Sequence, residues 1–292
     1  MKKNNILSSK RLEELKRKKR RKLINRTIIF FLFFLMFFIG LSFLFKWQKI
    51  NISQITISGN RVVSIEKIEE IINSNMEGNY LWLFPKSNFL ICPEKKIKSE
   101  LLQKYKRIKD ISFSNEEPDK LEVLVSEYEG KYLWCGISIP TLNKNNDDNK
   151  CYFLDNKGYV FDEAPYFSGE VYFKFYGHNN GELLGSYFLK DYWVNIISFK
   201  NNLEQLNLRP TAFWLDENED GNMALSYGPM IGPRIIFKMD SDFEKLAENL
   251  QAALSTEPLQ SNFKNKYSSL LYIDLRFGNK VYYKFTKELK NE

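Results

Sequence analysis

The apolar stretch TIIFFLFFLMFFIGLSFLF, residues 27–45, decides the organisation of this chain of 292 residues. It contains no charged residue and no proline. Residues 28–45 alone would form a helix of about 27 Å, close to the roughly 30 Å hydrocarbon core of a lipid bilayer. Because a helix satisfies its own backbone hydrogen bonds in lipid, we predict a transmembrane helix over residues 27–46.

Two other structures can produce an apolar stretch near an N-terminus. A buried core helix normally keeps a polar stripe, which this stretch lacks. A cleaved signal peptide has a shorter apolar region, roughly 7–15 residues, and ends at a small-residue cleavage site. Here Lys46-Trp47-Gln48-Lys49 follows directly. We therefore interpret the stretch as an uncleaved anchor, with Trp47 at the membrane interface.

The formal net charge of +7 is divided unevenly along the chain. Residues 1–26 form a basic tail that holds 12 of the 43 basic residues and 2 of the 36 acidic ones, a net charge of +10. The remaining 31 basic and 34 acidic residues give a net charge of −3. The positive-inside rule places the tail in the cytoplasm and the chain beyond the apolar stretch outside it. Residues 11–22 are either a solvated tail or a basic helix on anionic lipid headgroups.

The slightly acidic remainder of the chain argues against nucleic-acid binding. No sequence motif for catalysis, a cofactor or a metal ion is found, and the single histidine, His178, lies in a Gly/Asn turn. The acidic residues 216–220 are interpreted as a solvated hairpin tip. We therefore predict no catalytic residue, cofactor, metal site or small-molecule substrate. An envelope enzyme remains an alternative, because two carboxylates from distant positions can form an acid/base pair.

Residues 47–127 have the pattern of a small α+β domain. Alternating isoleucines in residues 50–57 predict a strand, and Gly59-Asn60 predicts a turn. Helices are predicted to follow, the first with Ser64 at its N-cap and the second from Pro93, with a short apolar piece at residues 80–84 between them. Two strands close the segment. The order strand, helix, helix, strand, strand suits helices packed on one face of a small sheet.

Residues 128–286 predict a mostly antiparallel β domain with two helices. The helices are expected at residues 188–206 and from a capping-box pattern at residues 241–244 through residue 254. Turn signals at residues 155–158, 220–222 and 278–279 separate aromatic-rich strands. Residues 287–292 are left as a short tail.

The chain has three cysteines, too few for a disulfide framework. Cys135 and Cys151 flank a polar loop between two predicted strands. They either pair across a hairpin outside the cytoplasm or remain free, because their separation in space cannot be read from sequence. No partner is expected for Cys92.

Four segments resemble the FtsQ/DivIB family of bacterial cell-division proteins. ITISGNRVVS at residues 55–64 resembles the first strand, Gly-Asn turn and helix start of the family's first extracytoplasmic domain. Residues 111–127 resemble the hairpin that closes the same domain. FLDNKGYVF at residues 153–161 and YIDLRFGNKV at residues 272–281 resemble an Asp-x-x-Gly hairpin and the terminal Asp-Leu-Arg strand. The order and spacing of these segments carry the resemblance.

The resemblance implies a POTRA (polypeptide-transport-associated) domain at residues 47–127 and an FtsQ/DivIB-type β domain at residues 128–286. It also implies a non-enzymatic, single-pass protein of the cytoplasmic membrane, located at the division septum. Family members bind the FtsB and FtsL proteins and other divisome components, and thereby regulate septal peptidoglycan synthesis. A POTRA-bearing adaptor for secretion or assembly is a further alternative.

In this family the partner adds a strand to the sheet edge near the end of the β domain. Here the corresponding strand offers aromatic anchors, and an arginine could form a bidentate bond to a partner carboxylate. The candidate partner-binding residues are Arg276, Phe277, Gly278, Asn279, Val281, Tyr282, Tyr283, Lys284 and Phe285. The alternative is that Tyr282 and Tyr283 are ordinary strand residues, one of them facing the core. The outer face of residues 50–57 and the following helix are a candidate surface for other divisome proteins.

Overall fold

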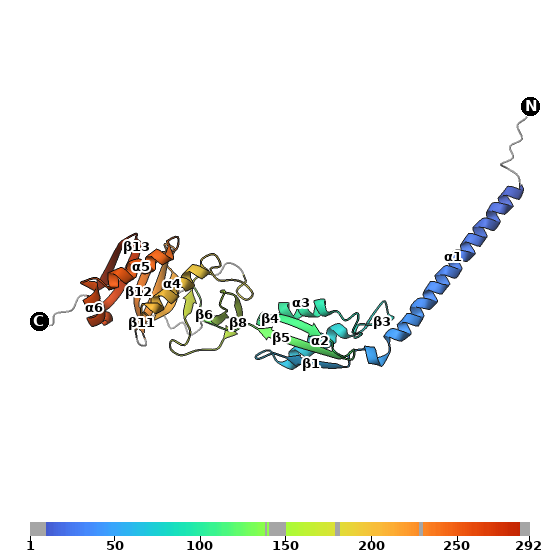
Figure 1. Ribbon diagram of the computed structural model, residues 1–292, viewed down its shortest axis with the longest axis horizontal. Coiled ribbons are helices and arrows are strands. Elements are labelled where there is room, and N and C mark those ends of the chain that lie inside the picture. Colours follow the sequence, from blue (N-terminus) through green and yellow to red (C-terminus); the bar gives the residue numbers. More distant parts are fainter. Residues whose placement is uncertain (1–9, 138, 140–149, 179–181, 228–229, 287–292) are drawn as a thin grey trace, which may run out of the picture. The chain divides into compact units, whose positions relative to one another are not determined.

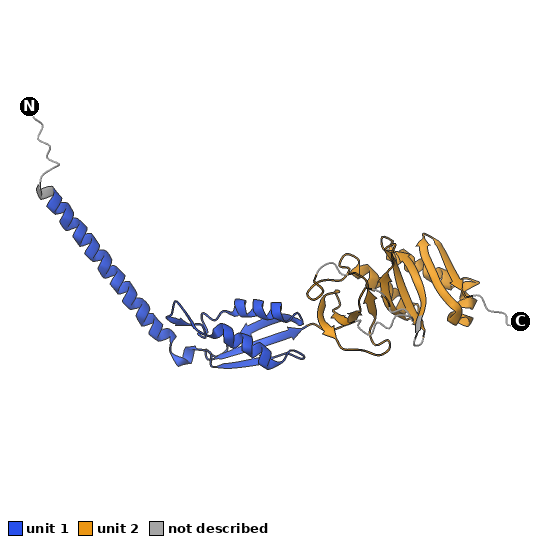
Figure 2. Cartoon of the chain, turned by 180° about the vertical axis from the view of Figure 1, so that it is seen from behind, with its two compact units in different colours: residues 1–127 blue, residues 128–292 orange. Residues whose placement is uncertain are grey.

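The computed structural model describes residues 10–137, 139, 150–178, 182–227 and 230–286 (Figure 1). The chain forms two compact units, residues 1–127 and residues 128–292 (Figure 2). Both units combine helices with a sheet, so the predicted α+β class is confirmed.

The first unit begins with a helix that is long and apolar enough to cross a membrane. This helix, α1 (Lys10–Phe45), has 36 residues and joins the described part of the basic tail to the apolar stretch without a break. Only 6% of its most apolar window is buried. That exposure is unlike a core helix and fits a single-pass anchor. A short 3-10 turn, η2 (Gln48–Ile50), follows it.

The rest of the first unit has the expected order of strand, helix, helix, strand and strand, with one added hairpin. The elements are β1 (Gln54–Ser58), α2 (Ile65–Met76), the hairpin β2 (Asn79–Tyr80) and β3 (Phe84–Pro85), α3 (Glu94–Lys104), β4 (Ile108–Ser114) and β5 (Lys120–Glu127). The sheet order is β1-β5-β4, with β5 parallel to β1 and antiparallel to β4. The sequence pattern had indicated only a short apolar piece where the hairpin lies.

Side-chain alternation along β5 explains why the helices cover one face of this sheet. Leu121, Val123 and Val125 are buried, whereas Leu124 between them is exposed. The buried face packs in one core with Ile97 and Leu101 of α3 and with three isoleucines of α2, Ile68, Ile71 and Ile72. Gly59 follows β1 with a φ of +82°, and a Cβ there would collide with the carbonyl oxygen of Val125. The predicted Gly-Asn turn therefore requires its glycine.

The loop that leads into α2 is held by a residue far away in the sequence. Ser64 occupies the N-cap, as predicted, but its side chain makes no capping hydrogen bond. Instead the Glu127 carboxylate, at the end of β5, accepts hydrogen bonds from the backbone N–H groups of Arg61, Val62 and Val63 at 2.9, 3.1 and 3.0 Å. This carboxylate fixes the loop between β1 and α2 to the last strand of the domain.

Replacing Glu127 with alanine is expected to lower the stability of the first unit by about 2 kcal/mol, because hydrogen bonds to a charged group are worth roughly 1.5–3 kcal/mol. Denaturant unfolding of the full chain would measure the change. Glu117→Ala is the matched control, since Glu117 is 59% exposed and forms a surface pair with Lys120. Equal losses in the two variants would contradict the anchoring role of Glu127.

The second unit is one large sheet with helices packed against it. Its strands are β6 (Tyr132–Trp134), β7 (Cys151–Leu154), β8 (Val160–Ala164), β9 (Lys174–Tyr176), β10 (Pro210–Leu215), β11 (Asp220–Tyr227), β12 (Met230–Lys238), β13 (Leu270–Phe277) and β14 (Lys280–Phe285). The order is β14-β13-β12-β11-β10-β9-β6-β7-β8. Five of the eight neighbouring pairs are antiparallel, so the sheet is mostly antiparallel, as predicted.

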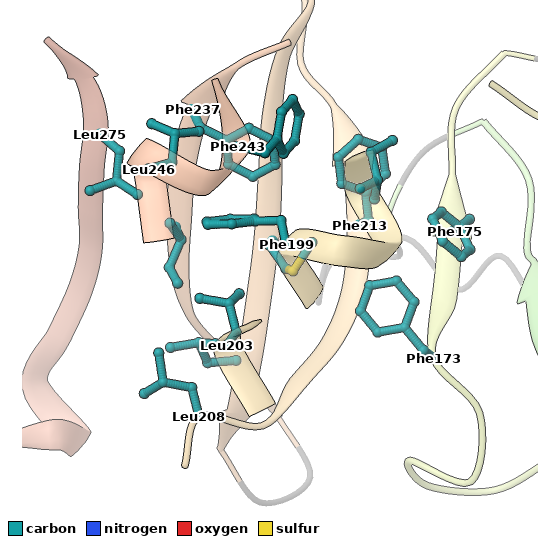
Figure 3. Close-up of a cluster of buried hydrophobic side chains, with 14 of the residues drawn as sticks. Phe173, Phe175, Phe199, Leu203, Leu208, Phe213, Phe237, Phe243, Leu246 and Leu275 are labelled. Atoms are coloured by element: carbon teal, nitrogen blue, oxygen red, sulfur yellow. The ribbon is translucent and has the colours of Figure 1, made fainter. Parts of the chain in front are cut away.

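The two predicted helices of this unit are α4 (Trp193–Gln205) and α5 (Phe243–Leu254), and a short third helix, α6 (Leu259–Asn265), follows with the 3-10 turn η3 (Tyr267–Ser269). The ring of Phe199 in α4 packs against those of Phe237 in β12 and Phe243 in α5, with centroid distances of 5.0 and 5.9 Å (Figure 3). Two boundaries differ from prediction. Helix α4 begins five residues later than expected, and Asp242 rather than the first residue of the capping box caps α5.

Local bonds confirm one further expectation about this unit and decide a pairing that the sequence left open. Asp155 accepts hydrogen bonds from the backbone N–H groups of Lys157 and Tyr159, both at 2.8 Å, and Gly158 has a φ of +81°, so the Asp-x-x-Gly hairpin forms. Cys135 and Cys151 form a disulfide that joins the end of β6 to the start of β7.

The third cysteine, Cys92, lies in the first unit and is a free thiol. Its burial, and to a lesser extent the charge of Glu94, raises the pKa of this thiol to about 11.

Candidate partner-binding site

Strand β14 lies at one edge of the large sheet. It pairs antiparallel with β13 on one side, and no strand of the described chain pairs with its other side. An edge strand presents backbone N–H and C=O groups to whatever lies beside it. The nine candidate partner-binding residues lie at the end of β13, in the hairpin turn and along β14.

Side chains alternate strictly along β14. Val281, Tyr283 and Phe285 are half-buried and pack against the main core, whereas Lys280, Tyr282 and Lys284 are exposed. The sequence had left open which of the two neighbouring tyrosines faces the core, and the structure assigns that role to Tyr283. Tyr282 is thus the tyrosine that a partner can reach.

Phe277 and Tyr282 form an exposed aromatic pair across the hairpin. They are 55% and 51% exposed, and their rings meet edge to face with centroids 5.1 Å apart. Gly278 turns the chain with a φ of +65°, and its carbonyl oxygen accepts a hydrogen bond of 3.0 Å from the Asn249 side chain of α5. Exposed aromatic side chains are typical anchors of protein interfaces.

Arg276 is engaged by carboxylates of the chain itself. Its Nε and Nη2 donate to Asp274 at 2.9 and 2.6 Å, and its Nη1 donates to Asp220 at 2.8 Å. These hydrogen bonds and charges raise the pKa of Arg276 above its ordinary value. The Arg276 guanidinium group, which was expected to bind a partner carboxylate, is therefore already bonded to two carboxylates of the chain. Arg276 instead joins β13 to β11 across the strand between them, with its guanidinium 5.7 Å from the Phe277 ring centroid.

A groove runs along the inner side of the last hairpin. Its volume is about 310 Å³, and β14 forms one wall while α5 and α6 form the other. The wall on this side consists of Asn279 from the hairpin turn and Val281 and Tyr283 from β14. The lining residues of the helical wall are Asn249, Ala252, Ala253, Thr256, Glu257, Pro258 and Leu259. Sequence reasoning missed this wall, because nothing in the helical pattern of α5 indicates which strand it meets.

The opposite edge of the sheet, β8, is less suited to a partner. Its first residue, Val160, exchanges backbone hydrogen bonds with Gly185 and Ser186, at 2.7 and 2.9 Å. Asp162 and Glu163 add charge to the same short strand. Covering loops and charges are common protections of a sheet edge. Of the two edges, β14 is the one that combines an uncovered side in the described chain with exposed aromatic rings.

The acidic residues 216–220 form the predicted hairpin tip between β10 and β11, but Asp220 is not solvated there, because its side chain is 14% exposed and pairs with Arg276. Asp216 accepts hydrogen bonds from the backbone N–H groups of Asn218 and Asp220 at 2.9 and 3.0 Å. Its carboxylate therefore shapes the turn. Among the residues that the structure describes, no group of three or more His, Cys, Asp or Glu side chains is placed to hold a metal ion.

Comparison with known proteins identifies the domain that follows α1. The family model described as POTRA domain, FtsQ-type, matches residues 50–128, which span β1 to β5. No curated protein matches the chain. An FtsQ-type POTRA domain that directly follows one apolar, membrane-length helix in the described chain supports an FtsQ/DivIB-like single-pass protein.

Proposed function

We propose that this chain is a non-enzymatic scaffold of the divisome, which binds FtsB- and FtsL-like partners outside the cytoplasm and so controls septal peptidoglycan synthesis. The FtsQ-type POTRA domain supports a role in division. The helix α1 fits an anchor in the cytoplasmic membrane, and the basic tail favours a cytoplasmic N-terminus.

The observation that carries the proposal is the edge strand β14, which pairs with a strand on one side only in the described chain, together with its exposed Phe277–Tyr282 pair. An extended partner segment would add a strand beside β14, where main-chain hydrogen bonds supply affinity and side chains supply selectivity. The alternation along β14 leaves Tyr282 and Lys284 to meet that segment, while Tyr283 keeps the strand attached to the core.

The groove beside β14 extends the proposed contact beyond a single strand. Its walls carry small, polar and apolar side chains, among them Ala252, Asn279 and Val281. Such a wall accepts the side chains of a helix or turn that continues from the added strand. The partner predicted by this surface therefore pairs an extended segment with a neighbouring compact one.

Deleting residues 48–126 is expected to abolish septal localisation, because we assign the POTRA domain to contacts with other divisome proteins. Its candidate surface is the outer face of residues 50–57 and α2. Imaging a fluorescent fusion through septation measures the outcome. A septal signal equal to that of the full chain would contradict the assignment.

The control for this deletion is the same fusion with Tyr166→Ala, a 92% exposed residue of the second unit. Both proteins must appear at equal levels in the membrane fraction, so that a lost septal signal reports localisation and not insertion. A scaffold further requires filamentous cells on depletion. Loss of a turnover activity on changing one or two carboxylates, with complexes unaffected, would favour the enzyme alternative instead.

A further inference from the structure

The β2–β3 hairpin is attached to the last turns of the spanning helix. Ser42 of α1 donates a 2.8 Å hydrogen bond to the carbonyl oxygen of Leu83, and the rings of Phe45 and Phe84 meet edge to face at 5.2 Å. The side chain of Asn88 donates to the carbonyl oxygen of Phe45 at 3.2 Å. Ser42 is only 4% exposed in a helix that is otherwise largely bare, because the hairpin covers it. Figure 1 shows β3 beside this end of α1.

The tip of this hairpin presents two large apolar side chains. Leu81 is 82% exposed and Trp82 is 91% exposed. Both have a positive φ, 49° and 62°, in a turn closed by a hydrogen bond from the N–H of Leu83 to the carbonyl oxygen of Tyr80. Glycine and asparagine normally fill such positions, since a bulky side chain is strained there. Strain of this kind is retained mostly where the side chains serve a function.

The attachment places the hairpin at the level of the bilayer. Ser42 lies three residues before the end of the apolar stretch, which corresponds to roughly 4.5 Å along the helix axis. Leu83, bonded to Ser42, is therefore level with apolar residues of α1, and the turn with Leu81 and Trp82 directly precedes it. The tip thus adjoins the part of the chain that fits a membrane span.

Two lysines and a tryptophan lie directly after the same end of α1. Lys46 and Lys49 follow the helix and line a cavity of about 570 Å³ with Asn51, Ser87 and, as its acidic member, Asp119. Trp47 between the two lysines is 60% exposed. Tryptophan concentrates at the interface between headgroups and acyl chains, and lysine reaches toward lipid phosphates from that level.

We propose that the β2–β3 hairpin is a second membrane contact, which inserts Leu81 and Trp82 into the interfacial layer of the leaflet where α1 ends. Lysines 46 and 49 then lie at the level of the phosphates. The contact restrains the POTRA domain at the bilayer surface, because the hairpin is continuous with α2 and α3. It depends on α1 as the anchor and not on the role in division.

Brominated lipid tests this contact in the full chain. Trp47→Phe removes the neighbouring interfacial tryptophan, and the protein is placed in vesicles of phosphatidylcholine and phosphatidylglycerol. Part of the phosphatidylcholine carries bromine on its acyl chain near the headgroup. We expect the lipid to quench part of the tryptophan emission, and we expect that part to disappear in Trp47→Phe/Trp82→Tyr. Bromine near the middle of the acyl chain should quench Trp82 less.

The remaining tryptophans, Trp134, Trp193 and Trp214, lie in the second unit and give the same background in both proteins. Near-ultraviolet circular dichroism confirms that Trp82→Tyr keeps the fold. Equal quenching in the two proteins overturns the proposal. So does emission from Trp82 that aqueous acrylamide quenches and brominated lipid does not, in which case the tip faces water and is open to a protein.

Discussion

Replacing Phe277 and Tyr282 together with alanine is expected to weaken binding of an FtsB-like partner about 30-fold or more. Truncating an aromatic anchor at the centre of an interface commonly costs about 2 kcal/mol, and each 1.4 kcal/mol is tenfold in affinity. Both side chains are more than half exposed, and neither belongs to the core of the unit. Their loss should therefore change affinity without unfolding the sheet. Calorimetry with the full chain in nanodiscs and the FtsB- and FtsL-like proteins measures it.

Matched controls separate this edge from exposed apolar surface in general. Tyr166→Ala and Val194→Ala remove side chains that are 92% and 75% exposed and lie outside β13 and β14. We expect the partner affinity of each control to stay within about twofold of that of the unchanged protein, because exposed side chains outside an interface contribute little. If the Phe277/Tyr282 double variant also binds within twofold while its circular dichroism is unchanged, strand addition at β14 is wrong.

Tyr283 cannot serve as a test of the same interface, although it lies next to Tyr282 in sequence. It packs against the main core and its ring meets that of Phe285 at 5.8 Å. An alanine there removes buried apolar contact, so a weaker complex would report a destabilised strand. Alternation predicted from sequence that the two tyrosines face opposite sides, but only the packing of β14 on α5 decides which side is the core.

Local sequence patterns predicted the helices, strands and turns better than they predicted which strands lie side by side in the sheet. Turn glycines such as Gly59 and Gly158 were readable because the glycine requirement is local. That β14 is an edge follows from the place of β13, which pairs parallel with β12 after a connection through α5 and α6. Parallel pairing over such a connection leaves no signal in a strand's own sequence.

The contacts that sequence reasoning missed join residues far apart along the chain. Ser64 stands at the expected N-cap of α2 but makes no capping hydrogen bond, whereas Glu127, at the end of the domain, accepts hydrogen bonds from the loop that precedes the helix. For the disulfide, sequence left the pairing open, because Cα separation depends on the register of β6 and β7. In each case the residue type indicated the kind of contact, but the sequence did not show which residues lie close together in space.

Arg276 is the residue whose role changed most, and its replacement is expected to destabilise the second unit by about 3 kcal/mol. Removing one member of a largely buried ion pair leaves the other charge without compensation, which commonly costs roughly 3–5 kcal/mol. The Asp274 and Asp220 side chains are 7% and 14% exposed, while Arg276 is 28% exposed, so the lower end of that range applies. Denaturant unfolding of Arg276→Ala in the full chain measures the loss.

A second substitution distinguishes this structural role from a partner contact. In Asp274→Asn/Arg276→Ala the buried charge next to the vacated guanidinium is removed, so part of the lost stability should return. Lys280→Ala changes an exposed side chain of β14 and is the control, and its free energy of unfolding should stay within about 0.5 kcal/mol of that of the unchanged protein. A partner-binding arginine would behave differently, since its alanine variant would lose affinity at unchanged stability. Because two carboxylates of the chain already hold its fork, we expect Arg276 to act on the partner only by fixing the strand that carries Phe277.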